Sequence, residues 1–290
     1  MRVQKYIFVL AAAFSIAGCD PEISGSLDDA SDADAGSADF STFVALGDSL
    51  TAGYADSALY RHGQVNSYPA IMAQQFALVG GGAFTQPLMP VGATGSLTLT
   101  PIGDLGLSDR LVLVPTGDPD RPASPFPIMP MQSTSIDVPL VGSFNNVGVA
   151  GAKSYHLGVN TYGDPASLPA AANPYFVRFA SSTGATMIGD AAIQVPSFFV
   201  LWIGNNDVLS YATGGGTGVD QNAADNIDPN TYGASDITDD VAFAGIYAGL
   251  VATLKVMPTT KGVLVNVPDV STIPYFTTVP FNAIPLDGVQ

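Results

Sequence analysis

The chain has few cysteines, histidines and basic residues. Its one cysteine, Cys19, excludes an intramolecular disulfide and any metal site built from several cysteines. Nine Lys and Arg residues stand against 25 Asp and Glu, and the formal net charge of −16 disfavours binding to nucleic acid or to an anionic surface. The sequence contains no P-loop and no G-x-G-x-x-G pattern, so it implies no nucleotide, and we expect neither a metal nor an organic cofactor.

The first residues are typical of an export signal. Arg2 and Lys5 precede an apolar stretch that is too short to span a bilayer, and Ala17-Gly18 then leads to Cys19. This ending resembles the lipobox of bacterial lipoproteins. It implies a signal peptide over residues 1–18, lipidation of Cys19 and a membrane anchor. The acidic residues after Cys19 resemble surface-export signals of some bacterial lipoproteins and favour the outer membrane or cell surface. The alternative is an ordinary secretory signal followed by a chance cysteine.

Residues 19–41 form an acidic segment with almost no large apolar side chain. The stretch Asp20–Asp39 carries seven carboxylates and no basic residue. Such a segment cannot bury enough apolar surface to order itself, so we expect a disordered tether between the membrane and a domain that starts at residue 42.

The stretch 43–54, FVALGDSLTAGY, is the most informative part of the chain. Its pattern predicts a buried strand over Phe43–Leu46, a tight turn at Gly47-Asp48-Ser49, and then a helix. A serine on such a turn exposes its hydroxyl beside free helical N–H groups, as a serine nucleophile requires. The alternative for an isolated GDS is an ordinary turn in which Ser49 is the helix N-cap.

Two more stretches place polar or glycine residues after apolar segments. The first is NVGVAGA, residues 146–152, with Gly148 and Gly151 expected in a loop after a strand. The second is FFVLWIGNND, residues 198–207, a strand-length apolar run that ends in polar residues.

Together, these three blocks resemble the SGNH hydrolase, or GDSL esterase/lipase, family. The first block matches Gly47-Asp48-Ser49-Leu50, and the third, G-x-N-D, matches Gly204-Asn205-Asn206-Asp207. The resemblance implies that Ser49 is the nucleophile. It also implies that the Gly151 N–H and the Asn206 side-chain amide help to bind the oxyanion. Gly47, Asp48, Gly204 and Asp207 are expected to support the turns.

The same family has a D-x-x-H block near its C-terminus, and this block has no match here. The two histidines, His62 and His156, follow Leu59 and Lys153 at the position where the carboxylate should stand. We expect both to be surface or structural residues, with His156 the better stand-in for a base. Our hypothesis is that the Asp and His lie beyond Gln290. The rival hypothesis is a pseudoenzyme.

Strand and helix patterns alternate along the chain. Helices are expected over residues 68–79 and 239–257, and GVLVNV, residues 262–267, is typical of a further buried parallel strand. The alternation predicts an α/β fold with a three-layer, doubly wound, flavodoxin-like parallel sheet. We expect the domain to cover residues 42–290, with insertions rich in β structure and loops at about 83–139, 160–195 and 210–236 and with its last strand–helix unit missing.

The resulting prediction is a serine hydrolase of carboxylic esters. Its partners would be a small-molecule, glycan or lipid ester and, through Cys19, the membrane. The alternative function is a non-catalytic surface lipoprotein that binds glycans or lipids in the same cleft.

Overall fold

The computed structural model describes residues 33–118 and 121–278, and the fold below concerns the unit that begins at Ala35. The expected signal peptide, Cys19 and the first part of the tether lie outside the described residues. Within the described part, no helix is both long and apolar enough to cross a membrane.

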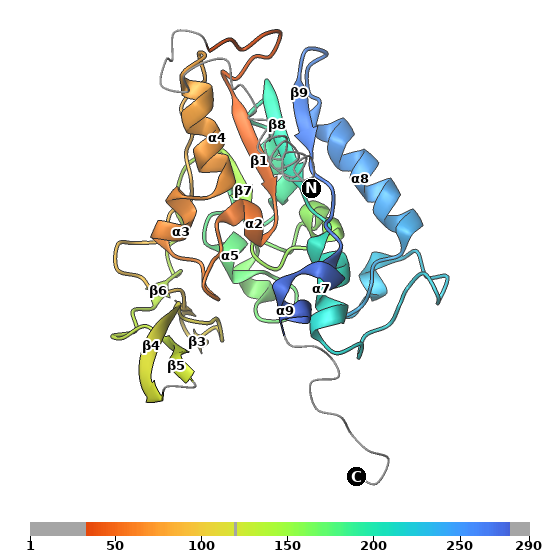
Figure 1. Cartoon of the computed structure of the whole chain (residues 1–290). Helices are drawn as coiled ribbons and strands as arrows, with labels where there is room; N and C mark the ends of the chain where they lie inside the picture. Colours follow the sequence, from red (N-terminus) through yellow and green to blue (C-terminus); the bar gives the residue numbers. More distant parts are fainter. Residues whose placement is uncertain (1–32, 119–120, 279–290) are drawn as a thin grey trace, which may run out of the picture. The chain divides into compact units, whose positions relative to one another are not determined.

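A four-stranded parallel sheet forms the centre of this unit (Figure 1). Its order is β7-β1-β8-β9, and every neighbouring pair runs parallel. The strands are β1 (Phe43–Gly47), β7 (Asn146–Gly148), β8 (Phe198–Trp202) and β9 (Lys261–Leu264). The prediction of an α/β protein with a parallel sheet is therefore confirmed. Because β7 and β8 lie on opposite sides of β1, the chain connections diverge there, and such a point commonly leaves a crevice at the carboxyl ends of the strands.

Successive side chains of each strand point to opposite faces of the sheet. Helices cover both of these faces. On one face, α4 (Tyr68–Ala77) packs Met72 and Phe76 against Phe43 and Ala45. On the other face, α8 (Asp240–Leu254) buries Leu250 and Leu254 in the cluster that holds Val44 and Leu46. Figure 1 shows these two helices flanking the strands.

The remaining helices are short. They are α2 (Ser49–Ala52), α3 (Arg61–Val65), α5 (Pro174–Val177), α6 (Met187–Ala192), α7 (Asn205–Thr213) and α9 (Pro274–Thr277). In the part of the chain that the structure describes, four short 3-10 helices accompany them, at Ser154–Gly158, Pro165–Ser167, Pro229–Thr231 and Val270–Thr272.

The first insertion is rich in β structure, as its sequence predicts. A three-stranded sheet joins β3 (Gly103–Asp104), β2 (Leu97–Leu99) and β6 (Thr134–Ser135). Beside it in sequence, β4 (Leu111–Asp118) and β5 (Arg121–Pro127) form an antiparallel hairpin.

Three expectations need correction. The strand expected over residues 262–267 exists as β9, but it is exposed rather than buried, and Val263 is 43% accessible. The reason is that β9 is the edge strand of the sheet. Gly148 is the last residue of β7 and is not in the following loop. The helix expected over residues 239–257 ends earlier, at Leu254, and its apolar Val241 is exposed because it lies on the side of α8 opposite Leu250 and Leu254.

The end of the expected tether already contacts the body of the protein. The Phe40 ring stacks on Phe76, with centroids 3.9 Å apart, and meets Phe198 edge-on. Lys261 Nζ also donates to the Ser37 carbonyl. Ordered contacts therefore begin a few residues before position 42.

Candidate active site

The turn after β1 presents Ser49 at the edge of the sheet. Asp48 is the N-cap of α2, and its Oδ1 accepts from the Leu50 N–H at 3.0 Å. The alternative in which Ser49 caps the helix is wrong, because Asp48 holds that position and Ser49 is the first helical residue. Ser49 is half-buried, and its hydroxyl has no hydrogen-bond partner among the described residues.

Glycine is required at position 47 because the turn is tightly enclosed. A Cβ there would lie 2.2 Å from both Thr51 Oγ1 and the Trp202 carbonyl oxygen. The chain therefore passes between β8 and the start of α2 only with no side chain at this residue.

The second block follows the neighbouring strand. Gly47 pairs with Gly148 in the parallel register, and the Val149 N–H donates to the Gly47 carbonyl at 3.0 Å. The chain then turns at Gly151, which is exposed and has φ +83°, a left-handed conformation that favours glycine. Gly151 thus lies just past the carboxyl end of β7, as its sequence predicts.

The third block begins α7 on the opposite side of β1. Gly204 precedes this helix with φ +120°, and a Cβ there would contact Val267 and Phe243 at 2.6–3.0 Å. Asn206, in the first turn, donates its Nδ2 hydrogen to the Ala152 carbonyl at 2.9 Å. The third block is thereby tied to the residue that follows Gly151.

Two buried carboxylates complete the links between the blocks. Asn205 Nδ2 donates to Asp48 Oδ2 at 2.7 Å. Asp207 accepts two hydrogen bonds from Ser154, from its N–H at 2.8 Å and from its hydroxyl at 2.7 Å. The structure therefore brings the three blocks to one edge of the sheet, although the hydrogen bonds join the neighbours of Ser49 and Gly151 rather than those two residues directly.

The electrostatics follow from burial. Burial raises the pKa of Asp48 to about 6, and the negative charge of Asp207 adds to the rise, whereas hydrogen bonds from Asn205 and Leu50 oppose it. Burial also lowers the pKa of Lys153, against the attraction of Asp207 and Asp236. The Lys153 ammonium is buried and donates to the Asp236 carbonyl oxygen at 2.7 Å.

Neither histidine is arranged as the base of a triad. His62 is exposed on α3. His156 is half-buried and stacks on Tyr162, with ring centroids 4.6 Å apart, and its Nδ1 accepts from the Lys153 backbone N–H at 3.0 Å. A triad histidine instead donates from Nδ1 to a carboxylate. Burial, with a smaller contribution from the Lys153 charge, lowers the pKa of His156 to about 4.

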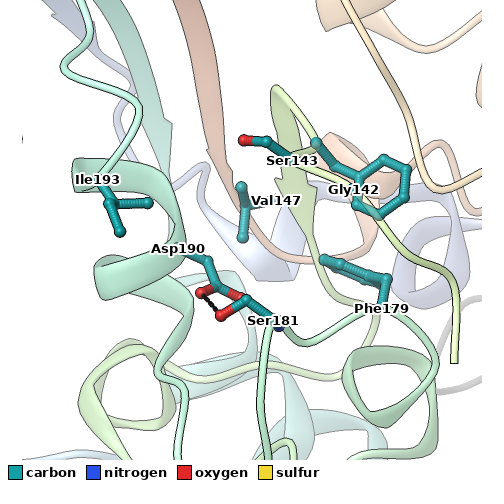
Figure 2. Close-up of a pocket in the computed structure, with 8 residues that line it drawn as sticks. Gly142, Ser143, Val147, Phe179, Ser181, Asp190 and Ile193 are labelled. Carbon is teal, nitrogen blue, oxygen red and sulfur yellow. Dashed lines mark hydrogen bonds between the residues drawn. The ribbon is translucent and has the colours of Figure 1, made fainter.

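A large cleft opens beside the second block. Its volume is about 920 Å³, and Gly151, His156 and Tyr162 are among the residues that line it, whereas Ser49 and Asn206 are not. Figure 2 shows a separate cavity of about 110 Å³ between Val147, Phe179 and Ile193, where the Ser181 hydroxyl donates to Asp190. This smaller cavity contains none of the predicted site residues.

The sequence argument missed several polar residues that hold the site together. Asn205 falls within the third block without an expected role of its own, and nothing in the sequence pattern marks Lys153 or Ser154, although all three are buried. Their position next to the glycines of blocks two and three was the one available signal. No cluster of three or more His, Cys, Asp or Glu suitable for a metal occurs within residues 33–118 and 121–278.

No family model, curated protein or solved structure matches the chain.

Proposed function

We propose that this protein is a serine hydrolase of carboxylic esters, with an SGNH-type, flavodoxin-like fold. The observation that carries the proposal is the junction of the three blocks, in which Asn205 binds Asp48 and Asn206 binds Ala152. An ordinary βα turn after β1 would not need a buried polar link to the third block, which is itself bonded to the second block. Catalysis by a serine does need them, because nucleophile and oxyanion donors must be held in one fixed arrangement.

In the proposed reaction, Ser49 Oγ attacks the acyl carbonyl carbon and its proton passes to a base. The backbone N–H groups of Ser49 and Gly151 and the amide of Asn206 stabilise the negative oxygen of the tetrahedral intermediate. Collapse expels the alcohol, which takes up the proton, and water then hydrolyses the acyl-enzyme. Removal of one oxyanion donor typically costs about 3–4 kcal/mol of transition-state stabilisation.

The base in this proposal is not His156, because its Nδ1 already accepts a backbone hydrogen bond. Neither histidine among the described residues is placed to serve as this base. The lipidated Cys19, export and anchoring at the outer membrane or cell surface belong to the same proposal.

The second candidate function is a surface lipoprotein that binds glycans or lipids without hydrolysis. The 920 Å³ cleft favours it as a specific observation, since this volume suits a sizeable ligand and the cleft does not include Ser49.

A fluorophosphonate probe separates the two functions. We expect the full-length protein to be labelled at Ser49, because Oγ displaces fluoride from phosphorus, and we expect Ser49→Ala to remove the label. Ser182→Ala, which changes an exposed loop serine, is the matched control and keeps the label. A folded protein without label at Ser49 contradicts the hydrolase proposal and favours the binding function.

A further inference from the structure

The hydrogen bond at His156 determines which ring nitrogen carries the proton. The Lys153 N–H points its hydrogen at Nδ1, so Nδ1 must hold a free lone pair. In a neutral imidazole the proton then resides on Nε2, which becomes a donor. Nε2 has no hydrogen-bond partner among the described residues, and the ring lines the large cleft.

The surroundings keep this donor neutral and in place. The ring is held by stacking on Tyr162 and by an edge-on contact with Tyr155, at 4.6 and 4.4 Å between centroids. The titratable groups that line the cleft with it are Lys153, Tyr155, Tyr162 and Tyr232. No carboxylate among the described residues lines the cleft, so nothing there stabilises an imidazolium.

The cleft is suited to an uncharged ligand rich in oxygen. Among the described residues that line it, Lys153 is the one cation and already donates to the Asp236 carbonyl, and the aromatic rings offer apolar faces. It also reaches two of the three elements that carry the proposed oxyanion donors. Gly151 lines it directly, and so does Ser210, one turn after Asn206, whose carbonyl accepts from the Ser210 hydroxyl at 3.0 Å.

We propose that His156 is a neutral Nε2–H donor that binds an acceptor oxygen of an uncharged, oxygen-rich ester in the cleft beside Gly151. This inference rests on the proposed hydrolase function. It assigns His156 to substrate binding rather than to proton transfer. To act as a base through Nε2, the ring would have to move its proton to Nδ1, where it would face the Lys153 N–H.

The first measurement is the ¹⁵N NMR spectrum of the histidine rings at pH 7. With two histidines in the chain, His62→Gln assigns the signals. We expect His156 to be neutral with its proton on Nε2. A ring protonated on Nδ1, or an imidazolium, overturns the proposal.

The second measurement is the binding of triacetin, a neutral triester, to the Ser49→Ala protein, which does not turn it over. We expect the His156 Nε2 signal to shift on binding. We also expect the dissociation constant to rise about tenfold in His156→Phe, which keeps the ring and removes the donor, because one hydrogen bond is lost. His156→Gln, which restores an N–H donor, should stay within about threefold of the parent, and His62→Phe is the matched control.

Absence of triacetin binding, an unshifted Nε2 signal, or equal affinity in His156→Phe overturns the proposal. Failure of the hydrolase function is detected separately, by fluorophosphonate labelling of the unsubstituted protein. Labelled Ser49 with an unresponsive His156 rejects only the role of His156. Triacetin binding through His156 without labelling of Ser49 rejects hydrolysis and keeps the binding site.

Discussion

The carboxyl edge of the parallel sheet and the β4–β5 hairpin show opposite relations between polarity and burial. At the sheet edge, Asp48, Asn205 and Asp207 are almost completely buried. In the hairpin, Leu113 and Phe126 are 74% and 58% exposed. Polar side chains are inside where a network of donors and acceptors receives them, and apolar ones are outside where a two-stranded ribbon has no second layer to cover them.

The difference indicates which part of the fold depends on specific hydrogen-bond partners for its stability. A buried carboxylate is costly unless it is hydrogen-bonded, so burial of Asp48 and Asp207 is sustained only by specific partners. The exposed side chains of the hairpin, such as Leu113 and Phe126, need no such partners and contribute little to stability. We therefore expect substitutions at the sheet edge to be severe and those in the hairpin to be mild.

Gly47→Ala should give the largest effect. The added methyl group would overlap Thr51 and the Trp202 carbonyl, so we expect a loss of more than about 4 kcal/mol in unfolding free energy, or no folded protein. The control is Gly117→Ala in the hairpin, where φ is +79° and the space is open. It should cost only about 1 kcal/mol. Similar urea midpoints for the two variants would contradict the comparison.

Asp207→Ala should come next. It leaves the buried N–H and hydroxyl of Ser154 without an acceptor, and we expect a loss of about 2–4 kcal/mol in urea unfolding. Asp104→Ala removes an exposed carboxylate that accepts from the Gly106 N–H, and it should cost no more than about 0.5 kcal/mol. If the loss in Asp207→Ala is as small as in Asp104→Ala, the buried network does not support the edge.

Asp48→Asn should show a pH dependence. Because the folded-state pKa of Asp48 is raised from 3.8 to about 6, its contribution to stability is fully present below pH 3.8 and is lost as the pH rises through 6. Asparagine stays neutral and still caps Leu50. The new side-chain amide at position 48 faces Asn205, whose buried Oδ1 has no partner. If the Asn205 amide flips, this Oδ1 can accept a hydrogen bond from the new amide.

The unfolding free energy of Asp48→Asn relative to the unsubstituted protein should therefore rise between pH 4 and pH 8, by at most about 3 kcal/mol. Urea titrations at the two pH values measure the difference. His156 is common to both proteins and cancels. A difference that does not change with pH would show that Asp48 is not penalised by burial.

The smallest effect is expected for Leu113→Ser in the hairpin. Most of the Leu113 side chain is already in water, so the unfolding free energy should change by less than about 0.5 kcal/mol. Leu201→Ser, in the core of β8, is the same substitution at a fully buried site and should cost several kcal/mol. A large loss in Leu113→Ser would mean that another surface covers the hairpin.

Elements defined by short-range patterns were predictable from sequence. The β1 and β8 strands are apolar runs that stop at glycine and polar residues. The helix α8 starts directly after Asp239, which caps it by accepting from the Ala242 N–H. Such signals act within a few residues, so one sequence is enough to find them.

Features that depend on distant partners were not predictable. The short helix α6 lies in a segment rich in Ser and Gly, and its buried residues, Met187 and Ala191, gain their environment from the core cluster that also holds α8 residues. The exposure of β9 depends on its place at the end of the strand order. The pairing of Asp48 with Asn205 joins residues 157 positions apart, and local periodicity carries no information about it.

The bond between Asp48 and Asn205 also sets an order of events during synthesis. At about 5–20 residues per second, Asn205 follows Asp48 from the ribosome after roughly 8–30 seconds. During that interval the turn that carries Ser49 has no amide to hold its carboxylate, and β1 has no β8 beside it. The turn that carries Ser49, the proposed nucleophile, would thus reach its final arrangement only after the third block has emerged.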